Sequence, residues 1–134
     1  MVLQSLQGLP AFIAYFCLAA ALVIAFLLIY THITPINEFE LIRNNVPGAA
    51  ISLGLSLLGF ALPLASAIAH AVNLIDCAVW GVVALVVQLM TFYVARVPIP
   101  DLSARISRGD LAPAIWLGLS SLTAGLLSAA SMAL

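Results

Sequence analysis

The sequence predicts an all-α integral membrane protein with four transmembrane helices, arranged as two tandem parallel two-helix repeats. Of its 134 residues, 65% are hydrophobic and 7% are charged, whereas a soluble domain carries roughly a quarter charged residues. Four apolar stretches are each long enough to cross a bilayer, and the chain matches itself at a fixed offset. Lipid, rather than water, is therefore expected to cover most of the surface.

The expected spans cover residues 9–30, 49–69, 77–95 and 111–133. About 20 apolar residues in a helix cross the hydrocarbon core, and the many short alternating strands of a membrane barrel are not seen in the sequence. The first stretch is expected to remain as a span, because no basic residue precedes it and it is longer than the apolar core of a signal peptide.

The two longer connections contain helix-starting signals. Asn37 followed by Glu40 resembles a capping box, and Asp101 has the same starting role in the other connection. Apolar residues follow at helical spacing in both, which is typical of short helices that lie in the membrane interface. We expect such helices in the loops 31–48 and 96–110.

The arginines predict the orientation. All four basic residues flank or lie within these two loops, which share one side of a four-span protein. The positive-inside rule makes that side cytoplasmic and places both termini in the periplasm. The residues concerned are Arg43, Arg96, Arg105 and Arg108.

An internal match supports a duplication. Shifting the chain by 64 residues aligns 50–58 with 114–122, with seven of nine positions identical, and also pairs the helix-starting residues of the two loops. The predicted repeats are residues 1–70 and 71–134. Because each holds two spans, both copies enter from the same side and are related by an axis along the membrane normal.

Several runs give the chain a resemblance to the domain-of-unknown-function 350 family of bacterial inner-membrane proteins. They are Ile42–Ile51, Gly59–Ser66, Asp76 with Trp80-Gly81 and Gln88, and Gly125–Ala130. The resemblance covers nearly the whole chain, with Ser128 as a departure where the family pattern has asparagine. It implies a duplicated two-helix unit in the bacterial plasma membrane, and it implies no established activity or site.

One stripe of the second span gathers polar and small residues. Pro63 cannot donate to the carbonyl of Gly59, so that carbonyl is free near mid-membrane. Two interpretations stay open: close helix packing with a proline kink, or a polar groove that solvates an ion or small solute. The stripe comprises Ser52, Ser56, Gly59, Pro63, Ser66 and His70.

Two further polar residues lie on the third span. Asp76 starts the helix and favours its dipole, or pairs with His70 as a proton relay or gate. Gln88 lies deep in the span, where an unpaired amide costs roughly 2–7 kcal/mol. We expect it to bind another helix, within the chain or across a subunit interface.

The fourth span has a small-residue face made of Gly118, Ser121 and Gly125, which is typical of a helix contact. Four aromatic residues lie toward span ends, as interfacial anchors often do: Trp80, Trp116, Tyr30 and Tyr93. Cys17 and Cys77 lie in apolar stretches and are expected to pack as small hydrophobic residues.

The functional prediction is a non-enzymatic oligomerising or scaffold module of the cell envelope. The histidines, His32 and His70, lie near opposite faces, and no serine has a base and an orienting group in reach. We therefore expect no enzyme, metal or cofactor, and the lack of a basic run argues against nucleic acid. The expected partners are the lipid bilayer and a second copy or another membrane protein. The alternative is a small ion or solute channel or transporter that uses the stripe of the second helix.

Overall fold

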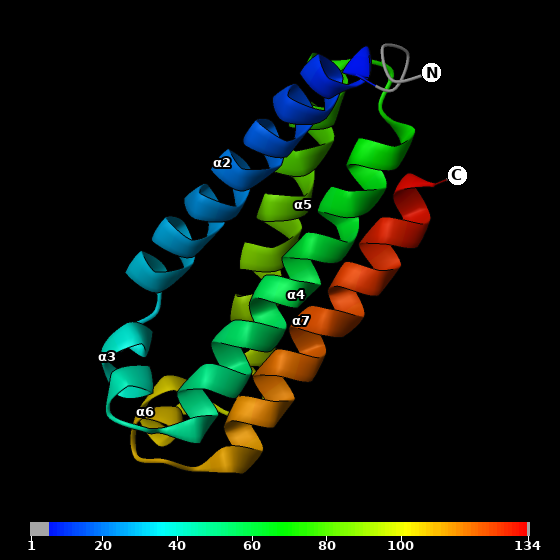
Figure 1. The fold of residues 1–134 in the computed structure, drawn as a ribbon. Helices are drawn as coiled ribbons and strands as arrows, with labels where there is room; N and C mark the ends of the chain where they lie inside the picture. Colours follow the sequence, from blue (N-terminus) through cyan, green and yellow to red (C-terminus); the bar gives the residue numbers. More distant parts are fainter. Residues whose placement is uncertain (1–5, 134) are drawn as a thin grey trace.

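The computed structural model describes residues 6–133, which form four long helices and two short ones (Figure 1). The long helices are α2 (Leu9–Ile33), α4 (Pro47–His70), α5 (Leu74–Ala95) and α7 (Leu111–Met132), and the short ones are α3 (Glu38–Arg43) and α6 (Leu102–Ser107).

The predicted fold class is confirmed. All four long helices have the length and apolar composition needed to cross a membrane. Their bounds agree with the predicted spans to within three residues. The largest differences are at α2, which continues to Ile33, and at α5, which begins at Leu74. Which side of the membrane each end faces stays a prediction.

The pair α4 and α7 forms the centre of the bundle. These helices run side by side over almost their whole lengths, and they make the most extensive contact of any two elements (Figure 1). The helix α5 packs against both of them, whereas α2 contacts α4 and α5 less extensively. The short helices α3 and α6 lie at one end of the bundle, which we call the arginine end.

An aromatic cluster fills the bundle near the arginine end. The ring centroids of Phe26 and Phe60 are 4.9 Å apart, and the Tyr30 ring lies 5.4 Å from those of Phe26 and Phe92. All four side chains are buried. Aromatic pairs at such separations add packing energy beyond the area that they bury, so this end of α2 is held firmly.

The turns that follow α3 and α6 share one backbone hydrogen bond and one positive-φ position. Val46 N donates to Leu41 O at 2.9 Å, and 64 residues later Asp110 N donates to Arg105 O at 3.0 Å. Each turn also holds a residue with positive φ at matched positions, Asn45 at 61° and Gly109 at 95°, a conformation that asparagine and glycine adopt most readily. The duplication stays a prediction, and these matched turns support it.

The expected helix caps differ in outcome. The Asn37 side chain accepts a hydrogen bond from Glu40 N at 3.2 Å, so this predicted cap is confirmed. Asp101 occupies the N-cap position of α6, as expected, but its side chain makes no capping hydrogen bond among the described residues. Its carboxylate lies 3.8 Å from the guanidinium of Arg108, and both side chains are exposed.

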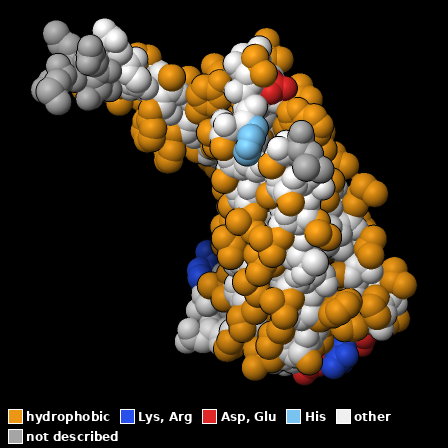
Figure 2. All heavy atoms as spheres, turned by 90° about the vertical axis from the view of Figure 1, so that its right-hand side faces the viewer, with side chains coloured by type: hydrophobic (Ala, Val, Ile, Leu, Met, Phe, Trp, Pro, Cys, Tyr) orange, Lys and Arg blue, Asp and Glu red, His pale blue; other side chains and the backbone are white. Residues whose placement is uncertain are grey.

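Hydrophobic side chains cover most of the flank of the molecule, and charged groups gather at its ends (Figure 2). Exposed large apolar side chains occur on all four long helices. This surface suits a bilayer, in which lipid covers apolar flanks and water reaches the ends.

Candidate functional site

The polar stripe of α4 faces α7. Ser52 donates to its own helix at Ala49 O, 3.2 Å away, and Ser66 donates across to Ala129 O of α7 at 2.9 Å. Ser52, Gly59 and Pro63 are all buried. These placements are those that the helix-packing interpretation requires. We call this contact the α4–α7 seam: Ser52, Ser56, Gly59, Pro63 and Ser66 of α4 against Gly118, Ser121, Gly125 and Ala129 of α7.

Glycines allow the two backbones of the seam to touch. The carbonyl oxygen of Gly59 lies where a Cβ of Gly125 would be, and a Cβ on Gly59 would collide with the backbone of Ser121. The Gly59 carbonyl, which Pro63 cannot hydrogen-bond, therefore packs against the Cα of Gly125, an arrangement that a weak C–H···O contact stabilises. Close approach through small residues is how helices associate in lipid.

A chain of three hydroxyl groups enters the seam. The Tyr30 hydroxyl lies 3.3 Å from Ser56 Oγ, and Ser56 donates to Ser121 Oγ at 3.1 Å. Tyr30 is only 2% exposed, so its prediction as an interfacial anchor is wrong. Its ring completes the aromatic cluster, and burial then requires a partner for its hydroxyl, which Ser56 supplies.

Gln88 is buried without a partner. Its side chain is 2% exposed, and neither its amide nitrogen nor its amide oxygen has a hydrogen-bond partner within residues 6–133. The expected hydrogen bond to another helix of the same chain is therefore not formed there. An unsatisfied buried polar group in a native structure calls for a specific explanation.

The structure gives His70 and Asp76 separate partners. His70 Nδ1 lies 2.9 Å from Ser66 O at the end of α4. The Asp76 carboxylate accepts from Val72 N at 3.1 Å, and Asp76 N donates to Asn73 Oδ1 at 2.8 Å at the start of α5. No hydrogen bond or ion pair joins the histidine and the aspartate among the described residues, so this geometry favours the helix-starting interpretation.

A second polar region lies at the arginine end, and sequence reasoning missed it. Thr34 and Glu38 face each other across the α2–α3 turn (residues 31–38), and the Thr34 hydroxyl donates to Glu38 Oε1. Glu38 is 2% exposed, and its other oxygen, Oε2, is buried and has no hydrogen-bond partner among residues 6–133. A signal was present, because the 64-residue offset aligns Glu38 with Leu102, an equally buried position.

Burial controls the chemistry of this acid. Loss of hydration raises the pKa of the Glu38 carboxyl above its ordinary range, and the hydrogen bond from Thr34 opposes part of that rise. Glu40, two residues later, is exposed. The two glutamates of α3 therefore differ in environment although they lie on one short helix.

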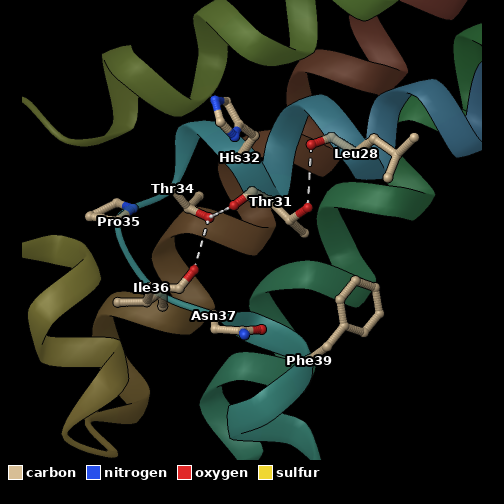
Figure 3. A pocket seen from close by; sticks show the side chains of 8 residues that line it. All are labelled: Leu28, Thr31, His32, Thr34, Pro35, Ile36, Asn37 and Phe39. Atoms are coloured by element: carbon tan, nitrogen blue, oxygen red, sulfur yellow. Dashed lines mark hydrogen bonds between the residues drawn. The ribbon is translucent and has the colours of Figure 1, made fainter.

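An open pocket of about 510 Å³ adjoins the α2–α3 turn (Figure 3). Thr34 lines this pocket while its hydroxyl contacts Glu38. Polar side chains share the lining with apolar ones, so water has access to the turn. The lining residues are Leu28, Thr31, His32, Thr34, Pro35, Ile36, Asn37 and Phe39.

Metal-binding groups do not converge in the part of the chain that the structure describes. No three histidine, cysteine, aspartate or glutamate side chains gather there. The arginine-end ion pairs join neighbouring charges, such as Arg105 with Asp110 at 3.2 Å. The notable groups of the interior are thus Glu38, Gln88 and the three hydroxyls.

Comparison with known proteins places these features in a family. A family model described as "Domain of Unknown Function (DUF350)" matches residues 4–132. The inner membrane protein YjfL of Escherichia coli K12 is 42% identical over 127 residues, which are 95% of this chain and 96% of that protein. The protein of the same name from Escherichia coli O157:H7 matches equally well. No solved structure matches the chain.

Proposed function

The chain belongs to the DUF350 family, and we propose that this member is a non-enzymatic module of the inner membrane that assembles with a second copy of itself through the first half of α2. The similarity to an inner membrane protein and the four candidate spans support a multi-pass location in that membrane. The single observation that carries the proposal is the loose packing of α2.

The buried residues of α2 are both near its end. Phe26 and Tyr30 are the residues of this helix that the bundle buries, whereas Phe12 is 63% exposed and Phe16 is also 63% exposed. The first turns of α2 project from the rest of the bundle (Figure 2). A helix packed along only part of its length leaves space for another helix beside it.

A groove lies between the first half of α2 and the end of α4. It has a volume of about 340 Å³ and is lined by Ala11, Phe12, Tyr15, Phe16 and Ile68. Packing of side chains, rather than expulsion of water, drives helix association in lipid, so a groove with stacked rings on one wall gives a second helix a large contact.

The packing of α5 and α7, the second helix pair, supports a second copy of the chain as the occupant of this groove. By the 64-residue offset α5 corresponds to α2, and α5 packs against α2, α4 and α7. The helix α2 lacks an equivalent set of neighbours in its own chain. A second copy supplies a helix of the same kind.

The natural cysteines provide the test. Cys17 is exposed on α2, contrary to its predicted packing role, and Cys77 is buried. In a Cys77→Ala background, we expect oxidative cross-linking in membranes to trap a dimer through Cys17. The control places Leu126→Cys, a lipid-exposed position on α7, in a cysteine-free background.

Equal cross-linking at both positions would show random collision and would contradict the proposal. A strictly monomeric mass in mild detergent together with no cross-linking at Cys17 would do the same. A dimer trapped at Cys17 but not at position 126 is the expected result.

The alternative function is a small ion or solute channel or transporter. The observation that favours it is the unpartnered Gln88 amide, together with the hydroxyl chain of Tyr30, Ser56 and Ser121. It requires water to reach Gly59, which touches the backbone of α7. Flux of ions or polyamines into liposomes that contain the purified protein tests it, and absence of flux opposes it.

A further inference from the structure

The α2–α3 turn brings together more hydrogen-bond acceptors than donors. Thr34 Oγ1 lies 3.3 Å from Thr31 O and 3.4 Å from Ile36 O (Figure 3). It also contacts Glu38 Oε1. A threonine hydroxyl has one hydrogen to donate. One donor therefore faces three acceptors, and Glu38 Oε2 adds a fourth oxygen, which is buried without a partner in the described part of the chain.

No positive charge compensates for this shortage within residues 6–133. The ion pairs found there join Arg105 and Arg108 to aspartates of the other loop, and Arg96 lies over the rings of Phe92 and Tyr93. An ionised carboxylate that is buried without a paired cation is costly.

The other charged or titratable groups around Glu38 are few. On α2 they are the Tyr30 phenol and His32, and on α3 they are Glu40 and Arg43, which are exposed like His32. The half of α4 before Pro63 contains no ionisable residue, and α6 with its flanks contributes the paired Asp101, Arg105 and Arg108.

We propose that Glu38 is a proton-binding site, whose carboxyl carries the hydrogen that the α2–α3 turn lacks. In the protonated state the carboxyl donates to Thr34 Oγ1, which frees the threonine hydrogen for the carbonyl of Thr31. Binding is the simple addition of one proton to one carboxylate, and water in the adjoining pocket exchanges it. Burial raises the pKa of this carboxyl, which agrees with the site.

The loop 96–110 shows how an uncharged side chain packs at the position that corresponds to Glu38. Leu102 occupies the position of Glu38 in the predicted second repeat and is 0% exposed. A protonated glutamate is uncharged and close to leucine in size, so it fills the same place. An ionised glutamate has to admit water or turn outward. Proton occupancy therefore sets the conformation of the α2–α3 turn.

The site ends at this turn. The hydroxyl chain begins at Tyr30, and no hydrogen bond between Tyr30 and Glu38 is found among the described residues. Glu38 thus binds a proton from the arginine end without passing it along the seam. The inference is independent of whether α2 binds a second copy.

Infrared titration of the purified full-length protein in lipid nanodiscs tests the site. The carbonyl band of a protonated carboxyl reports on neutral glutamate directly. We expect a band that persists at pH values where an ordinary glutamate is ionised, that is lost completely in Glu38→Gln and Glu38→Leu, and that is retained in the control Glu40→Gln. Circular dichroism confirms that each variant is folded, and Glu38→Leu copies a residue that the other loop already buries.

Three results would overturn the proposal. The first is a band that persists unchanged in both Glu38 variants, and the second is a wild-type carboxyl that titrates in the ordinary glutamate range. The third is loss of the band at fixed pH when choline is replaced by sodium or potassium, which would assign the oxygen cluster to an alkali cation instead of a proton.

Discussion

The α4–α7 seam and the α2–α3 turn both place polar residues inside an apolar bundle, but they differ in how those residues are satisfied. In the seam, serines bind carbonyls or one another, and Gly59 and Gly125 bring the backbones together. In the turn, which adjoins an open pocket, one oxygen of Glu38 has no partner among the described residues. The incomplete hydrogen bonding of Glu38, rather than the presence of polar residues as such, therefore distinguishes the turn from the seam.

The largest effect is expected from widening the seam. In Gly125→Ala the new Cβ collides with the Gly59 carbonyl, which is backbone and cannot swing away. Overpacking lowers the free energy of unfolding by about 1–3 kcal/mol or more, and we expect the upper end here. Unfolding in mixed detergent micelles measures it.

The matched control is Gly54→Ala, where a Cβ meets no atom within 4 Å. Alanine is a better helix former than glycine by about 1 kcal/mol, so this variant should be neutral or more stable. Equal destabilisation by both substitutions would contradict the close approach of the two backbones at the seam.

The next effect is expected at the turn and depends on pH. Burial raises the pKa of Glu38, so the folded state binds this proton more tightly than the unfolded state does. The resulting stabilisation is full below the ordinary glutamate pKa and is lost as pH rises through the folded-state pKa. Glu38→Leu should remove this dependence and unfold with about 1–3 kcal/mol more free energy than wild type at high pH.

Chemical unfolding across a pH series makes this measurement, with Glu40→Gln as the control that keeps the wild-type slope. A Glu38→Leu variant that keeps the same slope would show that another group titrates.

Much of the fold was predictable from sequence because its signals are local. Hydropathy located the four spans, and the Asn37 cap depends on a residue three positions away. The burial of Glu38 and Tyr30 was not predictable in this way, since it depends on how the end of α2 packs against α4. Cys17 is exposed for the same reason, because α2 leaves the bundle there.

Substitution of Gln88 tests whether a binding partner of its buried amide is missing from the structure. The expected effect on the free energy of unfolding is smaller than that at the turn. If nothing binds the amide, Gln88→Leu removes an unsatisfied group and should raise the free energy of unfolding by about 1 kcal/mol. A fall in stability in lipid would instead show that a ligand, water or a second chain binds this amide. Unfolding of the variant beside wild type decides between them.

The smallest effect is expected from the hydroxyl chain. Ser56→Ala removes the hydrogen bond to Ser121, and hydrogen bonds between membrane helices contribute about 0.6 kcal/mol on average. The same unfolding measurement detects it, with Ser131→Ala, an exposed serine that binds its own helix, as the control. A loss as large as that in Gly125→Ala would show that this bond, rather than close packing, holds the seam.

Cysteine accessibility in native membranes tests the contrast between seam and turn most directly. In a cysteine-free background, a water-soluble maleimide applied from both sides should label His32→Cys, which lines the pocket, and should leave Ser56→Cys unlabelled until the protein is denatured. Labelling of Ser56→Cys in the native protein at a rate similar to that of His32→Cys would contradict a closed seam and would favour a water-filled path along α4.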